Sequence, residues 1–240
     1  MPGLVIDMDD IAKQKFDVIL IVDCSSSMRG ERIGKVNEAI SDVAFCLRDL
    51  QYENANVDFF LSVLTFATDA QWNVRSVPVQ EYTYQPLRAG GQSNLVLAYD
   101  ELLCALKKRS AGGMMPDFGG VAPVMLLLSD GHPSGGSGKK KINELKKLPW
   151  FKVAIKYAVA IGLNDERTKT VLQDFTGERE TCLEACEPDV LKNIIKIVVL
   201  TASKVRSSSA GSYEYMSRSI SSTIKQEIGD ALDEIGTWDW

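Results

Sequence analysis

Apolar residues recur along this chain with two different spacings, which predict strands and helices in alternation. Val18 to Val22 form an unbroken apolar run rich in β-branched residues, as in a strand buried on both faces of a parallel sheet. From Gly30 to Leu50, apolar residues return every three or four positions, which predicts an amphipathic helix. The remaining patterns predict strands over 57–66, 72–77, 121–128, 152–161 and 181–185, and helices over 95–107, 139–148, 166–175 and 188–205.

The order of these elements predicts the α/β fold class: a doubly wound, Rossmann-like, mostly parallel six-stranded sheet with helices on both faces. Strand 72–77 follows strand 57–66 too closely for a helical crossover, so we expect it to pair antiparallel at one edge. We expect one domain over residues 16–205, after a lead-in over 1–15. The sequence over 206–240 predicts a serine-rich hinge followed by a helical tail. Two roles stay open for the tail: it folds back on the domain, or it docks on a partner after phosphorylation.

The composition argues against nucleic-acid and membrane partners. The formal net charge is −5 at pH 7, which gives no overall attraction to phosphate or anionic lipid. The sequence shows neither a signal-peptide pattern nor an apolar run of the ~20 residues that a membrane span needs. Five scattered cysteines, an odd number, indicate a reducing compartment. We therefore expect a soluble, cytoplasmic protein, and one histidine without a CxxC pair argues against a zinc site.

Oxygen-bearing side chains follow the predicted strands at three places. Asp23, Ser25 and Ser27 come at alternating positions directly after the first strand. Ser93 follows a glycine turn at the start of a helix, and Asp130 ends a central strand. In open α/β sheets, ligands bind outside the carboxyl ends of the strands. Carboxylate and hydroxyl oxygens that converge there suit Mg²⁺, which prefers an octahedron of oxygens at ~2.1 Å and retains some of its waters.

The same residues have an ordinary structural interpretation, which the first turn alone leaves open. Ser25 and Ser27 are common turn formers, and Asp23 is a common cap for the following helix. Ser93 is likewise a typical N-cap. The metal hypothesis therefore depends on the three turns meeting around one centre.

Three motifs together resemble those of the von Willebrand factor A (VWA) family. DCSSSM fits its Asp-x-Ser-x-Ser motif, GGQSNL resembles its glycine–threonine loop, and LLLSDG resembles its strand-terminal aspartate motif. The order and spacing of the elements fit the family from residue 14 to residue 205. The resemblance implies the VWA fold and a metal-ion-dependent adhesion site (MIDAS), which binds Mg²⁺, with Mn²⁺ or Ca²⁺ as alternatives.

The resemblance also implies a role for each site residue. Ser25 and Ser27 would bind the metal directly, Ser93 would do so in place of the usual threonine, and Asp23 and Asp130 would act through water or from behind the ligands. Neutral hydroxyls donate little charge, so the cation would remain electrophilic and take an Asp or Glu carboxylate of a protein partner as its last ligand. The implied function is a non-enzymatic protein-interaction module.

Within the family, the chain is similar to the bacterial TerY-type proteins of tellurite resistance and stress response. That similarity implies a Ser/Thr protein kinase and a PP2C-type phosphatase as partners. Two rival functions stay open. A phosphotransfer enzyme of the haloacid-dehalogenase type also places an aspartate after its first strand, but it needs a second acid at the position of Ser25. A VWA scaffold without a working metal is the other.

Overall fold

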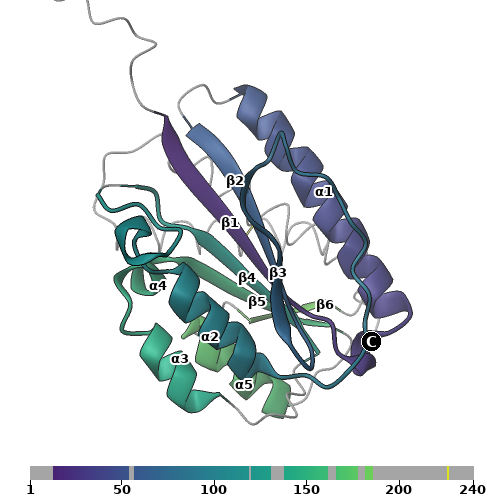
Figure 1. Ribbon diagram of the computed structural model, residues 1–240. Coiled ribbons are helices and arrows are strands. Elements are labelled where there is room, and N and C mark those ends of the chain that lie inside the picture. The colour runs from purple at the N-terminus through teal and green to yellow at the C-terminus, as the bar shows by residue number, and fades with distance from the viewer. Residues whose placement is uncertain are drawn as a thin grey trace, which may run out of the picture.

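The computed structural model describes residues 13–53, 57–118, 120–130, 138–161, 166–177, 182–185 and 226. These residues form a six-stranded sheet with the strand order β3-β2-β1-β4-β5-β6 (Figure 1). Neighbouring strands pair in parallel, except that β2 and β3 pair antiparallel at one edge. The predicted six-stranded sheet with one antiparallel edge strand is therefore confirmed.

Most elements lie close to their predicted positions. The strands are β1 (Gln14–Asp23), β2 (Val57–Phe66), β3 (Ala70–Pro78), β4 (Val124–Ser129), β5 (Ile155–Ile161) and β6 (Cys182–Ala185). The helices are α1 (Glu31–Glu53), α2 (Leu95–Ala105), α3 (Lys139–Leu145), α4 (Pro149–Val153) and α5 (Glu166–Thr176), with 3₁₀ turns η2 (Ser26–Met28) and η3 (Arg109–Ala111). The predicted helix over 188–205 and the tail, apart from residue 226, lie outside the described residues, as does most of the lead-in.

Helices cover both faces of the sheet, as predicted (Figure 1). Successive side chains of β1 point to opposite faces, so Leu20 and Ile21 belong to different apolar cores. Val36 of α1 packs in the first core, whereas Leu102 of α2 packs in the second together with residues of α3 and α5. Burial on both faces explains the unbroken apolar run from Val18 to Val22 within β1. Within the described ranges, no helix is long and apolar enough to cross a membrane.

Two prolines account for the main differences from the predicted boundaries. β4 begins at Val124, three residues later than predicted, after Pro123, which has no N–H to give to a strand ladder. The predicted strand from Lys152 was wrong at its start. Pro149 stands in the first turn of the short helix α4, so β5 begins only at Ile155.

Residues 79–94 form a strap that has no helix or strand and runs beside α1 to the start of α2 (Figure 1). The Asn37 side chain of α1 bonds both backbone groups of Leu87, donating to its carbonyl at 3.0 Å and accepting from its N–H at 2.8 Å. Arg48 donates to the carbonyls of Val79, at 3.1 Å, and Tyr82. These bonds satisfy backbone groups that lack secondary structure, and they hold the strap that leads into the glycine turn.

Candidate metal centre

The candidate site lies at the carboxyl ends of β1 and β4, the two central strands of the sheet. The parallel register pairs Val22 with Leu128, so Asp23 and Ser129 follow side by side.

The GGQS turn, which begins at Gly90, is held against the same end of the sheet by two backbone hydrogen bonds. Gly90 N donates to Cys24 O at 2.7 Å, and Ser26 N donates to Gly91 O at 2.9 Å. Segments about 65 residues apart in the chain therefore form one rim.

Asp23 is at the centre of this rim and is fully buried. Its Oδ1 accepts a hydrogen bond from Ser25 N at 2.8 Å. Its Oδ2 accepts from Ser93 Oγ at 2.9 Å and from Ser129 Oγ at 2.8 Å. Burial raises the pKa of Asp23 above its ordinary value, and the hydrogen bonds from the serines offset part of that rise. The three donors fix the carboxylate and draw all three turns together.

The hydroxyls of Ser25 and Ser27 lie next to each other, with their Oγ atoms 3.0 Å apart. Adjacent oxygens of an octahedron with ~2.1 Å bonds are about 3 Å apart, so this spacing fits two neighbouring Mg²⁺ ligands. Ser25 is buried, whereas Ser27 is exposed. The pair therefore connects the buried aspartate to the solvent side of the rim.

Asp130 reaches the same rim from the end of β4 and is fully buried. Arg32, in the first turn of α1, places its Nη1 atom 3.5 Å from Asp130 Oδ2. The same Nη1 donates to the carbonyl oxygen of Ser27 at 3.1 Å. One guanidinium thus touches two residues of the predicted ligand set, which places Asp130 on the Ser27 side of the site.

The structure gathers all five predicted residues. Neither Asp23 nor Ser93 is the N-cap of the α-helix that follows it. Helix α1 begins only at Glu31, so Asp23 is not its cap. The N-cap of α2 is Asn94, whereas the Ser93 hydroxyl donates to Asp23.

Among the described residues there is no group of three or more His, Cys, Asp or Glu side chains that suits a metal ion. The donor set is two carboxylates and three hydroxyls, which fits a hard, oxygen-preferring cation.

Sequence reasoning missed Ser129, Arg32 and Thr68 as parts of the site. Ser129 was detectable in principle, because two adjacent parallel strands that end together place their last residues side by side. Thr68 accepts a hydrogen bond from Gln92 N at 3.2 Å and supports the glycine turn. Nothing in the local pattern marks Arg32, since a charged residue in a first helical turn is ordinarily solvated.

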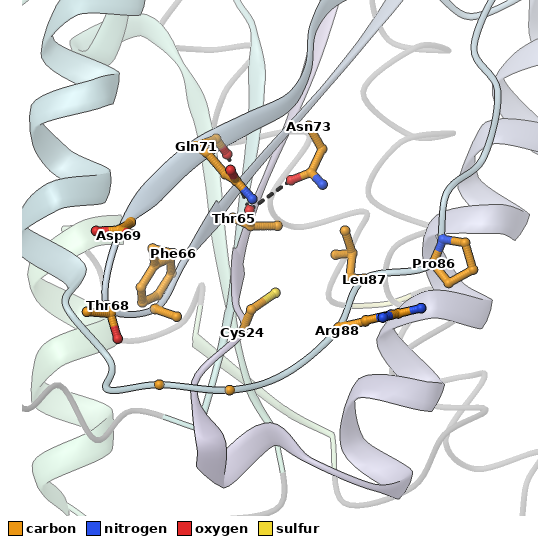
Figure 2. A pocket seen from close by; sticks show the side chains of 13 residues that line it. Cys24, Thr65, Phe66, Thr68, Asp69, Gln71, Asn73, Pro86, Leu87 and Arg88 are labelled. Carbon is orange, nitrogen blue, oxygen red and sulfur yellow. Dashed lines mark hydrogen bonds between the residues drawn. The ribbon is translucent and has the colours of Figure 1, made fainter.

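A polar cavity of about 500 Å³ opens beside the rim, between the end of β2, the start of β3 and the strap (Figure 2). Thr65 Oγ1 donates to Asn73 Oδ1 at 2.8 Å on one wall, and Arg88 lies on the strap side. The Cys24 side chain points into the cavity. Cys24, Gly90 and Gly91 line this cavity and also belong to the bonded turns of the site. The cavity and the candidate metal centre are therefore neighbours.

The Cys24 thiol is expected to resist alkylation although it faces this cavity. Burial raises the pKa of Cys24 to about 12, and the charge of Asp23 adds to the rise. At pH 8 such a thiol is roughly 10⁻⁴ thiolate, against about a quarter for an ordinary thiol with a pKa of ~8.5. Peptide mass spectrometry after brief iodoacetamide treatment should find Cys104, which is exposed, modified at least tenfold faster than Cys24. Equal labelling in the folded protein, and not only in denaturant, would contradict this.

Known proteins resemble this chain in sequence and fold. The family model of the von Willebrand factor type A domain matches residues 17–196. Inter-alpha-trypsin inhibitor heavy chain H1 of Sus scrofa is 25% identical over 135 residues, which are 53% of this chain and 14% of that protein. A von Willebrand factor type A structure from Catenulispora acidiphila has a TM-score of 0.57 at 16% identity, covering 80% of this chain and 43% of that chain.

A further structure is that of proximal thread matrix protein 1 from the mussel byssus, with its MIDAS motif occupied by zinc. Its TM-score is 0.52 at 16% identity, and the match covers 78% of this chain and 46% of that chain. The chain thus spans less than half the length of each of these relatives, and the structural likeness shows the fold alone. Because the family model matches well over half of its 240 residues, the chain belongs to the von Willebrand factor type A domain family.

Proposed function

We propose that this protein is a non-enzymatic, divalent-cation-dependent protein-interaction module. VWA domains typically mediate protein interactions, and the observation that carries the proposal here is the convergence of three turns on Asp23. Ser93 and Ser129 bond one of its oxygens, Ser25 N bonds the other, and the Ser25 and Ser27 hydroxyls lie beside it. Burying these oxygens costs less free energy when a cation binds them.

Ser25, Ser27 and Ser93 are the residues proposed to hold the cation directly, with Asp23 and Asp130 behind them or bridged by water. The proposed cation is Mg²⁺, with Mn²⁺ or Ca²⁺ as alternatives. The zinc-occupied MIDAS of the mussel protein supports a divalent ion in general. When bound, the cation would supply an electrophilic position for a partner's carboxylate, because three neutral hydroxyls donate little negative charge to it.

The surroundings of Asp23 favour binding over phosphotransfer. A nucleophilic aspartate must present an oxygen to its substrate. Both oxygens of Asp23 accept hydrogen bonds, and its side chain has no exposed surface. Ser25 also stands where the dehalogenase-type chemistry needs an acid. These observations support the interaction module over the enzyme.

The cavity beside the rim suggests where the rest of a partner chain would lie. A segment that places its acid on the metal would pass over Gly90 and Gly91 toward Thr65, Asn73 and Arg88. Amide, hydroxyl and guanidinium groups there can bond the partner's backbone or polar side chains. The proposed partner is therefore an acidic, polar protein segment.

The finer assignments belong to the same proposal. They are a TerY-type role in tellurite resistance and stress response, a Ser/Thr kinase and a PP2C-type phosphatase as partners, and action in the cytoplasm. The motifs DCSSSM, GGQSNL and LLLSDG support the VWA level, and the Leu-Ile-Val-Asp segment over 20–23 suggests the subfamily. The proposed domain covers residues 16–205. Residues 206–240 are proposed as a tail that a kinase phosphorylates and that then docks on a partner.

Calorimetric titration of the full chain with MgCl₂, MnCl₂ and CaCl₂ tests the proposal. We expect a binding heat with a stoichiometry of one for at least one of these cations. Affinity capture with Mg²⁺ and with EDTA should then show partners that require the cation. Absence of binding heat for all three cations would favour the scaffold without metal. Cation-dependent hydrolysis of p-nitrophenyl phosphate that Asp23→Ala abolishes would instead establish the enzyme.

A further inference from the structure

We infer that Arg32 competes with the metal: its guanidinium offsets the charge of Asp130 while no cation is bound and thereby lowers the affinity for the cation. The inference rests on the proposed function, since it concerns the same site. It deepens that function by naming a residue outside the family motifs that would set the cation concentration at which the site fills.

The first observation is where the guanidinium lies. Its Nη1 atom is 3.5 Å from Asp130 Oδ2 and 3.1 Å from Ser27 O. It contacts the rim from the side on which Asp130 and the exposed Ser27 stand. Any divalent ion bound by the Ser25 and Ser27 hydroxyls would be close to this positive charge, and like charges at such distances repel appreciably even near a protein surface.

The second observation is the balance of charge in the site. Asp23 and Asp130 are both fully buried, and burial makes an uncompensated carboxylate costly. Asp23 is compensated by the three hydrogen bonds described above. For Asp130, Arg32 supplies a full positive charge. A cation that enters the site takes over this compensation, so Arg32 and the cation act in part as alternatives.

The third observation is that Arg32 is able to give way. Its side chain is 32% exposed, whereas that of Asp130 is not exposed at all. An arginine on the first turn of a helix can turn its long side chain to solvent and rehydrate its charge. The cation therefore displaces a flexible group from a fixed one, and no rearrangement of the sheet is needed.

Linkage gives this arrangement an unusual signature. A group that stabilises the metal-free state and opposes the metal must, when neutralised, weaken the metal-free protein and tighten metal binding. A merely structural residue would weaken the protein without tightening the metal. The two effects have opposite signs, so one pair of measurements separates them.

The test uses the full chain with Arg32→Gln and Arg32→Met, two neutral side chains that keep an aliphatic stem. We expect the Mg²⁺ dissociation constant from calorimetry to fall about three- to tenfold. In EDTA the melting temperature should fall, and saturating Mg²⁺ should restore most of the loss. Arg32→Lys keeps the charge and should bind Mg²⁺ within about twofold of wild type.

Arg29→Gln is the matched control. It removes the same charge three residues earlier, from a side chain that is exposed and donates to Ala89 O at 3.4 Å, and it should change the affinity less than twofold because exposed charges are screened. Unchanged or weaker Mg²⁺ binding in both neutral variants, with binding by wild type intact, would overturn the role of Arg32 alone. No Mg²⁺ binding by wild type would instead overturn the proposed function.

Discussion

Replacing Ser25 and Ser27 together with alanine is expected to abolish Mg²⁺ binding and with it the cation-dependent capture of partners. The two hydroxyls are neighbours at 3.0 Å and supply two of the three proposed direct ligands. Changes behind a metal's ligands already cost 10- to 100-fold in affinity, so the loss of two ligands should exceed ~100-fold. Calorimetry with MgCl₂ and capture in Mg²⁺ and EDTA measure both effects.

The fold should survive this double substitution. The Ser25 and Ser27 hydroxyls bond each other. Replacing both residues removes this donor and acceptor together, so neither hydroxyl is left behind unpaired. Asp23 keeps its bond from the Ser25 backbone N–H, which alanine also has. We expect a melting temperature in EDTA within about 4 °C of wild type.

Ser26→Ala is the matched control for this prediction. Ser26 lies between the two proposed ligands and is exposed, and it holds the glycine turn through its backbone N–H to Gly91 O. Its side chain is not a proposed ligand, so Mg²⁺ affinity and capture should stay as in wild type. Equal Mg²⁺ affinity in the double variant would remove these hydroxyls from the proposed metal centre.

The sheet was predictable because its signals are local and strong. β2 was predicted at its observed bounds, Val57–Phe66, since a long apolar run between polar segments has few alternative structures. The antiparallel edge followed from the short connection to β3. α4 was missed because its apolar residues continue into β5, and only Pro149 marks the helix. A mostly apolar stretch such as 149–161, interrupted only by Lys152 and Lys156, cannot by itself show where a helix stops and a strand starts.

The gathering of the candidate residues at one edge of the sheet was predictable, but the contacts that hold them in place were not. Parallel strands end at one edge, so Asp23 and Asp130 could be expected to meet there. The strap depends on bonds from Asn37 and Arg48, 50 and about 30 residues away in the chain. Arg32 of α1 contacts Asp130 at the end of β4, 98 residues away in the chain. Such contacts depend on tertiary placement, which no local pattern encodes.

Gly91→Ala is expected to damage both the stability of the protein and the candidate site. Gly91 has φ +82°, in the left-handed region that side chains disfavour, and an added Cβ would lie 2.4 Å from Thr68 Oγ1. The backbone term alone costs about 1–2 kcal/mol, and the overlap adds to it. Gly91 O accepts from Ser26 N, and Ser93 follows two residues later, so a displaced turn would misplace proposed ligands. We expect at least about 2 kcal/mol lost in urea unfolding and roughly tenfold weaker Mg²⁺ binding.

Two further variants separate the conformational cost from the overlap. Gly112 has φ +79° but nothing within 4 Å of an added Cβ, so Gly112→Ala should show the backbone cost alone and leave Mg²⁺ binding unchanged. Thr68→Ala in the Gly91→Ala background removes the hydroxyl that the new Cβ would strike, although it also removes the bond from Gln92 N. The double-mutant cycle should therefore show a favourable coupling of about 1 kcal/mol or more. If the two changes simply add, the close approach of the turn to Thr68 is not what requires glycine at this position.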